Sequence, residues 1–395
     1  YGKWLGKPGD KITQSLNLLL IATSLALFAR GFQRINSIRT GATLSIALAS
    51  FFLCSAAWSV GPGASLRQGI LYLFVVIGAA GIVSNLESDD FMDLLALVCF
   101  LTGVVSLVLL FVSPGNALTS DGDFIGIFPQ KNLLGQAMAI GALACLHGLR
   151  TRSRKRWRSA GMLLLITIIA LESQSATSCV TIFFFCGTDA LITLIRKGGV
   201  AQLLAIGAVV VLLTPCLLLA AYPESLLEMI GKDPTLTGRT DIWTYVIPDI
   251  YQKLWFGWGY EAFWSPDNPA AMEIGESLRW FAPQAHNGLL EMLLSVGLIG
   301  TAFLIFMLAR NISLGVRCLR TSDRSLAISS LLCCAGIILL GITETVLLAG
   351  LEASTGVFFI IGLYCERALR LRQGHSAASR RPIHRHAAQR QTAST

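Results

Sequence analysis

The sequence is poor in charge. Only 14% of its 395 residues are Asp, Glu, Lys or Arg, whereas soluble domains carry roughly one quarter. Hydrophobic types make up 54% of the chain, and the mean hydropathy is +0.64. This composition excludes a disordered chain, a coiled coil, a disulfide-stapled secreted module and an ordinary cytosolic enzyme. It predicts an integral membrane protein.

Several catalytic signatures are missing as well. The chain has no HExxH, no GxSxG, no Walker GxxxxGK[ST] and no glycine-rich dinucleotide fingerprint. Membrane metalloproteases, serine hydrolases and ATP-driven pumps therefore have no support. None of the ten cysteines lies in the polar segment 222–287, and no CxxC pair occurs. Neither a disulfide framework nor a metal site is expected.

Apolar stretches are numerous, and most are long enough to cross about 30 Å of hydrocarbon as helices, although the one that ends at Glu172 is short. Eleven occur, near residues 13–29, 42–60, 67–85, 92–112, 132–149, 159–172, 177–195, 200–221, 288–309, 325–342 and 346–365. A tight hairpin or a broken helix is expected at 173–176. Because the chain begins with Tyr1, we also expect an upstream start and one further span. The predicted fold is an all-α polytopic membrane protein with about 11 to 12 transmembrane helices.

The basic residues predict the orientation. Of the 31 Lys and Arg residues, 22 fall in the connections and tail on one side of these spans, which the positive-inside rule makes cytoplasmic. The +8 charge therefore follows from topology, and no nucleic acid partner is indicated. Four regions are expected: a bundle of about eight spans (1–221), a large periplasmic loop with short helices (222–287), about three further spans (288–366) and a basic, disordered cytoplasmic tail (367–395).

The loop is rich in aromatic residues. It holds five of the eight tryptophans and twelve aromatic residues in all. Two interpretations are compatible with this enrichment: an interfacial belt at headgroup level, and a stacking surface for sugar rings. The candidate sugar contacts are Trp243, Trp258 and Tyr260.

Arg239 stands at a predicted helix start. Apolar residues recur downstream at helical spacing, namely Ile242, Val246, Ile250 and Leu254, and Thr237 or Thr240 can cap that helix. Arg239 would then lie beside free backbone N–H groups, which suits a phosphate or diphosphate. The alternative is a simple pair with Asp241 or a headgroup. Pro248 is expected to kink or divide the helix.

His286 is the one histidine expected on the outer face, which makes it a candidate for proton transfer near neutral pH. Asn287 can cap the next span, and Glu291, one turn deeper, can orient the imidazole. The alternative is a helix cap beside an interfacial histidine. Two further external cations, Lys131 and Arg67, can meet Arg239 at one polyanionic headgroup. The Asp121-Gly-Asp123 piece fits a turn better than a metal site.

These pieces resemble the O-antigen ligase and polymerase superfamily of bacterial inner-membrane glycosyltransferases. The similarity runs from about Trp58 to Gly300 and is carried by AAWSVGPGASLRQG, GIFPQKNLLG, LTGRTDIW, WFGWGYEAFW and AHNGLLEMLLSVGLIG. The KN-containing piece and the GWGYEAFW segment are most similar to the exopolysaccharide-polymerase branch. One departure concerns the Ser-Arg pair of many members, since this chain has Ser173-Gln-Ser-Ala-Thr177 there. Lys131 can supply the missing charge.

The resemblance implies a metal-independent, inverting transfer at the periplasmic face of the inner membrane. The donor would be an oligosaccharide on undecaprenyl diphosphate, with no other cofactor, and the acceptor a glycan or the lipid A core. His286 would act as base or acceptor-positioning group, Arg239 as diphosphate clamp, and Glu291 as the group that orients His286. Lower-ranked substrate contacts are Lys131, Arg67, Arg279, Trp243, Trp258, Tyr260 and Asn287.

Several functions remain compatible with these residues. A polymerase of exopolysaccharide or O-antigen repeat units and a ligase to the lipid A core use the same donor type and differ in acceptor. A carrier or flippase for lipid-linked sugar, with the aromatic loop as a lid, is a different class, and a noncatalytic scaffold is a fourth. The expected partners are membrane lipids, with a chain-length regulator and a flippase implied by the family alone.

Overall fold

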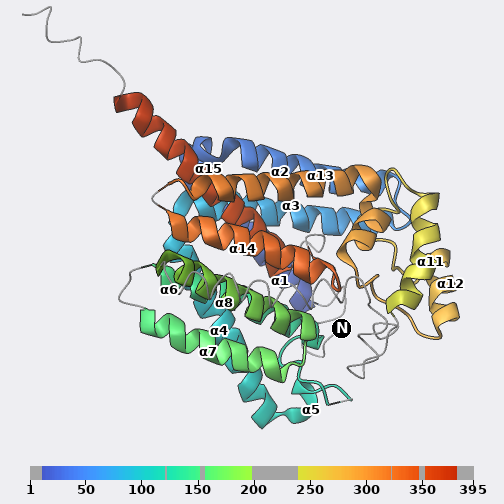
Figure 1. Cartoon of the computed structure of the whole chain (residues 1–395). Coiled ribbons are helices and arrows are strands. Elements are labelled where there is room, and N and C mark those ends of the chain that lie inside the picture. The colour runs from blue at the N-terminus through green and yellow to red at the C-terminus, as the bar shows by residue number, and fades with distance from the viewer. Residues whose placement is uncertain are drawn as a thin grey trace, which may run out of the picture.

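The computed structural model describes residues 11–120, 122–151, 156–197, 239–321, 323–346 and 352–379. In this part of the chain the regular secondary structure is helical, apart from one isolated bridge between Leu118 and Phe124. The helices are α1 (Lys11–Gly31), η1 (Phe32–Ile38), α2 (Arg39–Cys54), η2 (Ser55–Ala57), α3 (Pro62–Asn85), α4 (Ser88–Val112), α5 (Pro114–Ala117), α6 (Lys131–Arg150), α7 (Arg156–Glu172), α8 (Ala176–Lys197), α11 (Arg239–Gln252), α12 (Pro269–Leu278), α13 (Gly288–Cys318), α14 (Arg324–Gly341) and α15 (Ala353–Ser379). The long helices form a bundle, with α11 and α12 gathered at one end (Figure 1). We call this the loop end and the other the opposite end.

Within the described ranges, seven helical stretches are long and apolar enough to cross a membrane: Thr13–Ala57, Pro62–Asn85, Ser88–Val112, Lys131–Arg150, Ala176–Ile195, Gly288–Cys318 and Arg324–Gly341. The first joins two expected spans. Because α1 and α2 both pack on α3, η1 is a turn between two crossings. The architecture is that of a multi-pass membrane protein.

Three expected spans need comment. The 17-residue α7 and the helix α15 are not among the seven stretches that are long and apolar enough to cross a membrane. The expected span 200–221 lies outside the described residues, so the count of eleven to twelve stays a prediction. The tight connection expected at 173–176 is confirmed, because α7 ends at Glu172 and α8 begins at Ala176.

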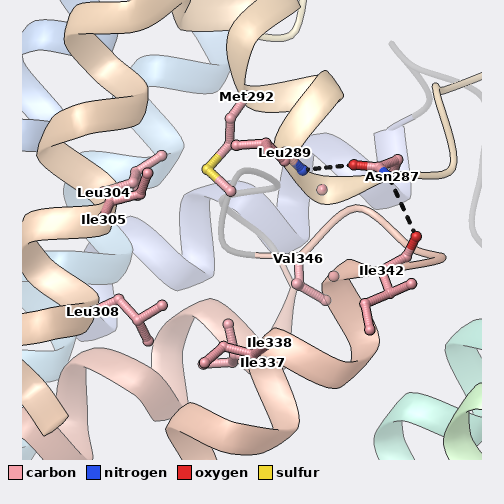
Figure 2. A pocket seen from close by; sticks show the side chains of 12 residues that line it. Asn287, Leu289, Met292, Leu304, Ile305, Leu308, Ile337, Ile338, Ile342 and Val346 are labelled. Carbon is pink, nitrogen blue, oxygen red and sulfur yellow. Dashed lines mark hydrogen bonds between the residues drawn. The ribbon is translucent and has the colours of Figure 1, made fainter. Parts of the chain in front are cut away.

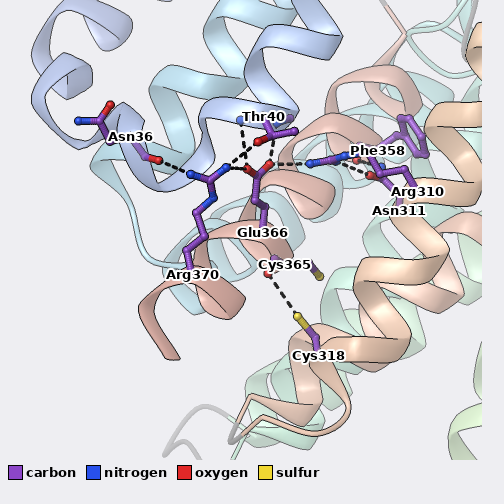
Figure 3. A network of polar contacts seen from close by, with 10 residues as sticks. Asn36, Thr40, Arg310, Asn311, Cys318, Phe358, Cys365, Glu366 and Arg370 are labelled. Carbon is purple, nitrogen blue, oxygen red and sulfur yellow. Dashed lines mark hydrogen bonds and ion pairs between the residues drawn. The ribbon is translucent and has the colours of Figure 1, made fainter. Parts of the chain in front are cut away.

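A buried carboxylate fixes the opposite end of the bundle. Glu366 of α15 accepts hydrogen bonds from the backbone N–H groups of Thr40 (3.2 Å) and Gly41 (2.7 Å) at the start of α2. It also pairs with Arg310 of α13 (2.6 Å) and Arg370 (2.9 Å), as Figure 3 shows. A buried charge is stable only when so many donors surround it. This cluster therefore joins α2, α13 and α15.

The expectation that the basic tail is disordered from residue 367 was wrong for its first part. The helix α15 continues without interruption to Ser379. Arg370 holds this extension by donating to the Asn36 carbonyl (2.9 Å) and the Thr40 hydroxyl (2.6 Å), in addition to its ion pair with Glu366. The rest of the tail, 380–395, lies outside the described residues.

The loop end has its own small core. Ile242, Val246 and Ile250 of α11 are buried against Phe263, Ala271 and Ile274, and Leu254 packs beside them. The helical spacing read from the sequence is therefore confirmed. Of the two outcomes expected at Pro248, a kink or a division of the helix, the division does not occur, since α11 runs through it from Arg239 to Gln252. Burial of one apolar face on both sides of Pro248 favours the continuous helix over the break.

Helix α13 is broken at Gly297, whose φ is 64°. The backbone of the loop fills the break: Trp258 and Gly259 N–H groups donate to the carbonyls of Leu294 (2.8 Å) and Ser295 (3.1 Å). In return Leu298 donates to Leu254 (2.7 Å). A Cβ on Gly297 would lie 2.5 Å from the Gly257 nitrogen. Because irregular backbone at membrane depth must be paired inside the protein, two glycines make this junction feasible.

Candidate active site

The backbone of His286 is strained and firmly held. Its φ is 49°, a left-handed value that residues other than glycine rarely adopt. The preceding residue, Ala285, makes two hydrogen bonds that fix its peptide groups: its N–H donates to a Glu291 carboxylate oxygen (2.7 Å), and its carbonyl accepts from the Trp243 indole (2.9 Å). Strain that the surroundings maintain in this way clusters at functional sites.

Asn287 fixes the other side of His286. Its side-chain oxygen accepts from the N–H groups of Leu289 (3.0 Å) and Leu290 (3.1 Å), so the predicted helix cap is confirmed. Its amide also reaches the Ile342 carbonyl at 3.5 Å. His286 therefore sits between a capped helix and a clamped peptide, with its side chain 16% exposed.

The described side-chain contacts of Glu291 are with the loop. Both of its oxygens lie close to the Trp264 indole nitrogen, at 3.0 and 3.1 Å, and one also receives the Ala285 N–H. These contacts hold the backbone that leads into His286. Among the described residues no direct contact joins Glu291 to the imidazole, so this carboxylate can orient His286 only through the backbone of Ala285.

The carboxylate that faces the imidazole belongs to Glu344, just after α14. One of its oxygens lies 3.8 Å from Nδ1 of His286, and the other accepts a hydrogen bond from the Asn132 amide at 2.6 Å. Its neighbour Thr343 is hydrogen-bonded to Thr177 of α8 at 2.6 Å. Glu344 is 3% exposed, so its charge interacts with the ring through little water.

Sequence reasoning missed this pairing, although two signals were visible. An acidic residue at the end of an apolar run is costly in a membrane and is functional by default, which applies to Glu344. The KN piece places Asn132 at the start of α6. Gln284 completes the surroundings of the ring, with its amide nitrogen 3.3 Å from Nδ1 of His286.

Lys131 lies next to Asn132 in sequence and pairs with Asp123 at 3.0 Å. Asp123 belongs to a turn in which Gly122 has a φ of 84° and donates its N–H to the Thr119 carbonyl at 3.1 Å. The turn expected for this piece is confirmed, while Asp121 lies outside the described residues. Lys131 is thus a cation near the candidate base, already partnered by a carboxylate.

The remaining candidate residues are placed as follows. Arg239 opens α11, but its side chain lies outside the described part. Arg67 on α3 and Arg279 at the end of α12 are exposed, and no described contact joins them to His286. The Trp258 indole donates to the Asp249 carbonyl at 2.9 Å, so it supports the loop.

Tyr260 does not have the position expected of a sugar contact. Its side chain is fully buried and stacks on Phe52 with ring centroids 4.6 Å apart, and it meets Tyr72 edge to face at 5.7 Å. A ring enclosed on these sides offers no face to a sugar. The expected substrate contact is therefore a core residue that attaches the loop to α2 and α3.

An apolar cavity begins beside His286 and lies between α13 and α14 (Figure 2). Its volume is about 330 Å³. The polar group at its mouth is Asn287, and the rest of the lining is aliphatic or thioether: Gly288, Leu289, Met292, Leu304, Ile305, Leu308, Ile337, Ile338, Gly341, Ile342 and Val346. The site thus joins an ionisable cluster to a space suited to a hydrocarbon chain.

Comparison with known proteins agrees with this arrangement. Residues 133–305 match a family model described as O-antigen ligase, a range that contains His286. The chain is also 30% identical over 281 residues to the exopolysaccharide production protein ExoQ of Rhizobium meliloti (strain 1021). That alignment covers 68% of this chain and 63% of the relative, so the chain spans somewhat less than two thirds of the relative's length. The chain therefore belongs to the O-antigen ligase and polymerase superfamily, in its exopolysaccharide branch.

Proposed function

We propose that this protein is an inner-membrane glycosyltransferase that joins oligosaccharide repeat units carried on undecaprenyl diphosphate, at the periplasmic face. The observation that carries the proposal is the strained His286, which has Glu344 beside its ring and is followed directly by Asn287 at the mouth of an apolar cavity. The family match and the relative in exopolysaccharide production support the same class of reaction.

In the proposed reaction His286 is the general base. An acceptor hydroxyl loses its proton to the imidazole while its oxygen attacks the anomeric carbon of the donor. The bond between that carbon and the diphosphate oxygen breaks, and the diphosphate leaves with the bonding electrons. Attack opposite the leaving group inverts the anomeric centre. No redox step or further reactant is needed.

Glu344 would stabilise the imidazolium that forms. Its carboxylate and Gln284 both face Nδ1 of His286, so Nε2 is the nitrogen assigned to the acceptor proton. The 3.8 Å separation between Glu344 and Nδ1 is longer than a hydrogen bond. Such contacts tighten when substrate binds. The Asn132 amide would hold the carboxylate in place.

The departing diphosphate requires positive charge. Arg239 stands in the first turn of α11, where backbone N–H groups and the helix dipole also favour an anion. Lys131 would assist by exchanging its partner Asp123 for a phosphate oxygen. It would thereby supply the positive charge of the missing Ser-Arg pair. The apolar cavity between α13 and α14 would take the first isoprene units of the lipid.

The proposal is tested by the sizes of lipid-linked and released glycan in a strain that lacks this protein. The strain is rescued with the wild type, His286→Ala or the tail variant His384→Ala as a control for histidine loss. A polymerase is supported if single repeat units accumulate and only the wild type and the control restore long chains. Full rescue by His286→Ala at equal protein level would contradict an enzyme and favour a carrier or scaffold.

A second candidate is a ligase that moves finished glycan to the lipid A core, favoured by the description of the matching family model as O-antigen ligase. The same experiment separates the two functions. A ligase predicts that long chains still form in the deletion strain but stay on the lipid carrier.

A further inference from the structure

The opposite end of the bundle holds a second pocket, which the proposed reaction does not use. Its volume is about 500 Å³, and it lies where α1 and α3 end. It is lined by Leu27, Arg30, Gln33, Arg34, Asn85 and Leu86. The lining combines two cations, two carboxamides and two apolar side chains, and it contains no acidic residue.

The pocket is built on a fixed junction between two helices. The Asn85 amide donates to the carbonyls of Leu27 and Gly81, both at 2.8 Å, and so joins the end of α1 to the end of α3. Gly31 lies at the same crossing, where any side chain would collide with Ser84. The walls therefore keep their spacing without a ligand.

The two arginines are not neutralised by a carboxylate among the described residues. Within the part of the chain that the structure describes, the Arg34 guanidinium reaches only the Ser84 carbonyl, at 3.5 Å. The acidic residue next to the pocket wall, Glu87, is paired with Arg367 at 2.6 Å. Arg30 and Arg34 are exposed, and both line the pocket together with Gln33. The pocket therefore presents uncompensated positive charge.

The surroundings identify the anion that fits. Both α1 and α3 are apolar helices, so their ends lie where lipid headgroups meet water. Leu27 and Leu86 provide an apolar wall, and Phe32, which precedes the lining residue Gln33 in the chain, is 60% exposed. A soluble anion would gain nothing from these groups, whereas a lipid would place its phosphate on the arginines and its acyl chains on the apolar wall.

We propose that this pocket binds the phosphate group of an anionic membrane lipid. Arg30 and Arg34 pair with the phosphate, Gln33 and Asn85 border the polar part of the headgroup, and the acyl chains follow Leu27, Leu86 and Phe32. The site lies at the far end of the bundle from His286, so its failure would leave the proposed reaction untouched.

The test measures binding of phosphatidylglycerol to the full chain purified in detergent, by native mass spectrometry, with phosphatidylcholine as the neutral comparison. The pocket variant is Arg30→Gln with Arg34→Gln. The control is Arg317→Gln with Arg320→Gln, which removes the same charge from two exposed arginines at the same end. Each arginine near anionic lipid is worth about fivefold in affinity, so the pocket variant should bind roughly thirtyfold more weakly, with the control unchanged.

Two results would overturn the proposal. An equal loss in both double variants would show general attraction to surface charge, and displacement of the lipid by equimolar inorganic phosphate would show a site for a soluble anion. If the double variant does not stay folded in neutral detergent, Arg30→Gln alone should still weaken binding roughly fivefold. Unchanged binding in that single variant would also refute the assignment.

Discussion

The pairing of Glu344 with His286 gives the sharpest prediction. Glu344→Gln keeps the size of the side chain and an oxygen that can accept from Asn132, but it removes the negative charge 3.8 Å from Nδ1. Two unit charges at about 4 Å interact by about 4 kcal/mol at an effective dielectric constant near 20. The side chains are 16% and 4% exposed, so solvent screening is modest.

The charge on the imidazole develops only in the transition state, so its loss of stabilisation should act on kcat. Allowing for relaxation, we expect a loss of about 2 to 4 kcal/mol, which is a fall of roughly 30-fold to 1,000-fold in kcat with KM little changed. The assay is the joining of purified lipid-linked repeat units by protein in detergent. Glu344→Asp should recover part of the rate.

The control is Glu276→Gln, which changes an exposed carboxylate on α12 that has no described side-chain contact with His286 or Glu344. It should retain nearly the full rate. In a His286→Ala background, Glu344→Gln should cause no further loss, because residues that act as a unit are not additive. A full rate in Glu344→Gln, or an equal loss in the control, would refute the pairing.

Three further predictions concern other parts of the site and fold. Gly297→Ala should destabilise the protein by more than about 2 kcal/mol. The φ of 64° is unfavourable for alanine, and the new Cβ would collide with the backbone of the loop at Phe256 and Gly257. The measurement is thermal unfolding, and the control is Gly161→Ala, whose Cβ would meet open space and which should show no such loss of stability. Trp243→Phe removes one hydrogen bond of about 1 kcal/mol and should lower kcat roughly fivefold at normal protein level. Lys131→Ala should impair turnover nearly as much as Arg239→Ala, and retained activity would remove Lys131 from the site.

Local sequence patterns predicted the local structure well. The apolar run at 67–85 became α3, and the spacing of Ile242, Val246 and Ile250 became the buried face of α11. The Asn287 cap also formed as expected. Hydrophobic periodicity and capping depend on neighbours within one or two turns, so the sequence alone carries them.

Contacts between distant segments were not predictable in the same way. Glu291 was the nearest carboxylate to His286 along the chain, yet it holds Ala285 and Trp264 instead. Tyr260 belongs to a polar segment rich in aromatic residues, but its ring is buried against Phe52. Which side chains meet depends on how helices cross and where their ends align, and short-range patterns contain little of that information.

The sequence by itself therefore determined a helical membrane protein, its main apolar segments, its superfamily and the candidate base His286. Its low charge and long apolar runs mean that most of the chain is stable only in the hydrocarbon of a lipid bilayer. Only the tertiary structure brought Glu344 and Asn132 to the imidazole and opened α13 at Gly297 for the loop. A buried charge or an unpaired backbone group must find its partner wherever packing places one, and that partner is set by three-dimensional proximity.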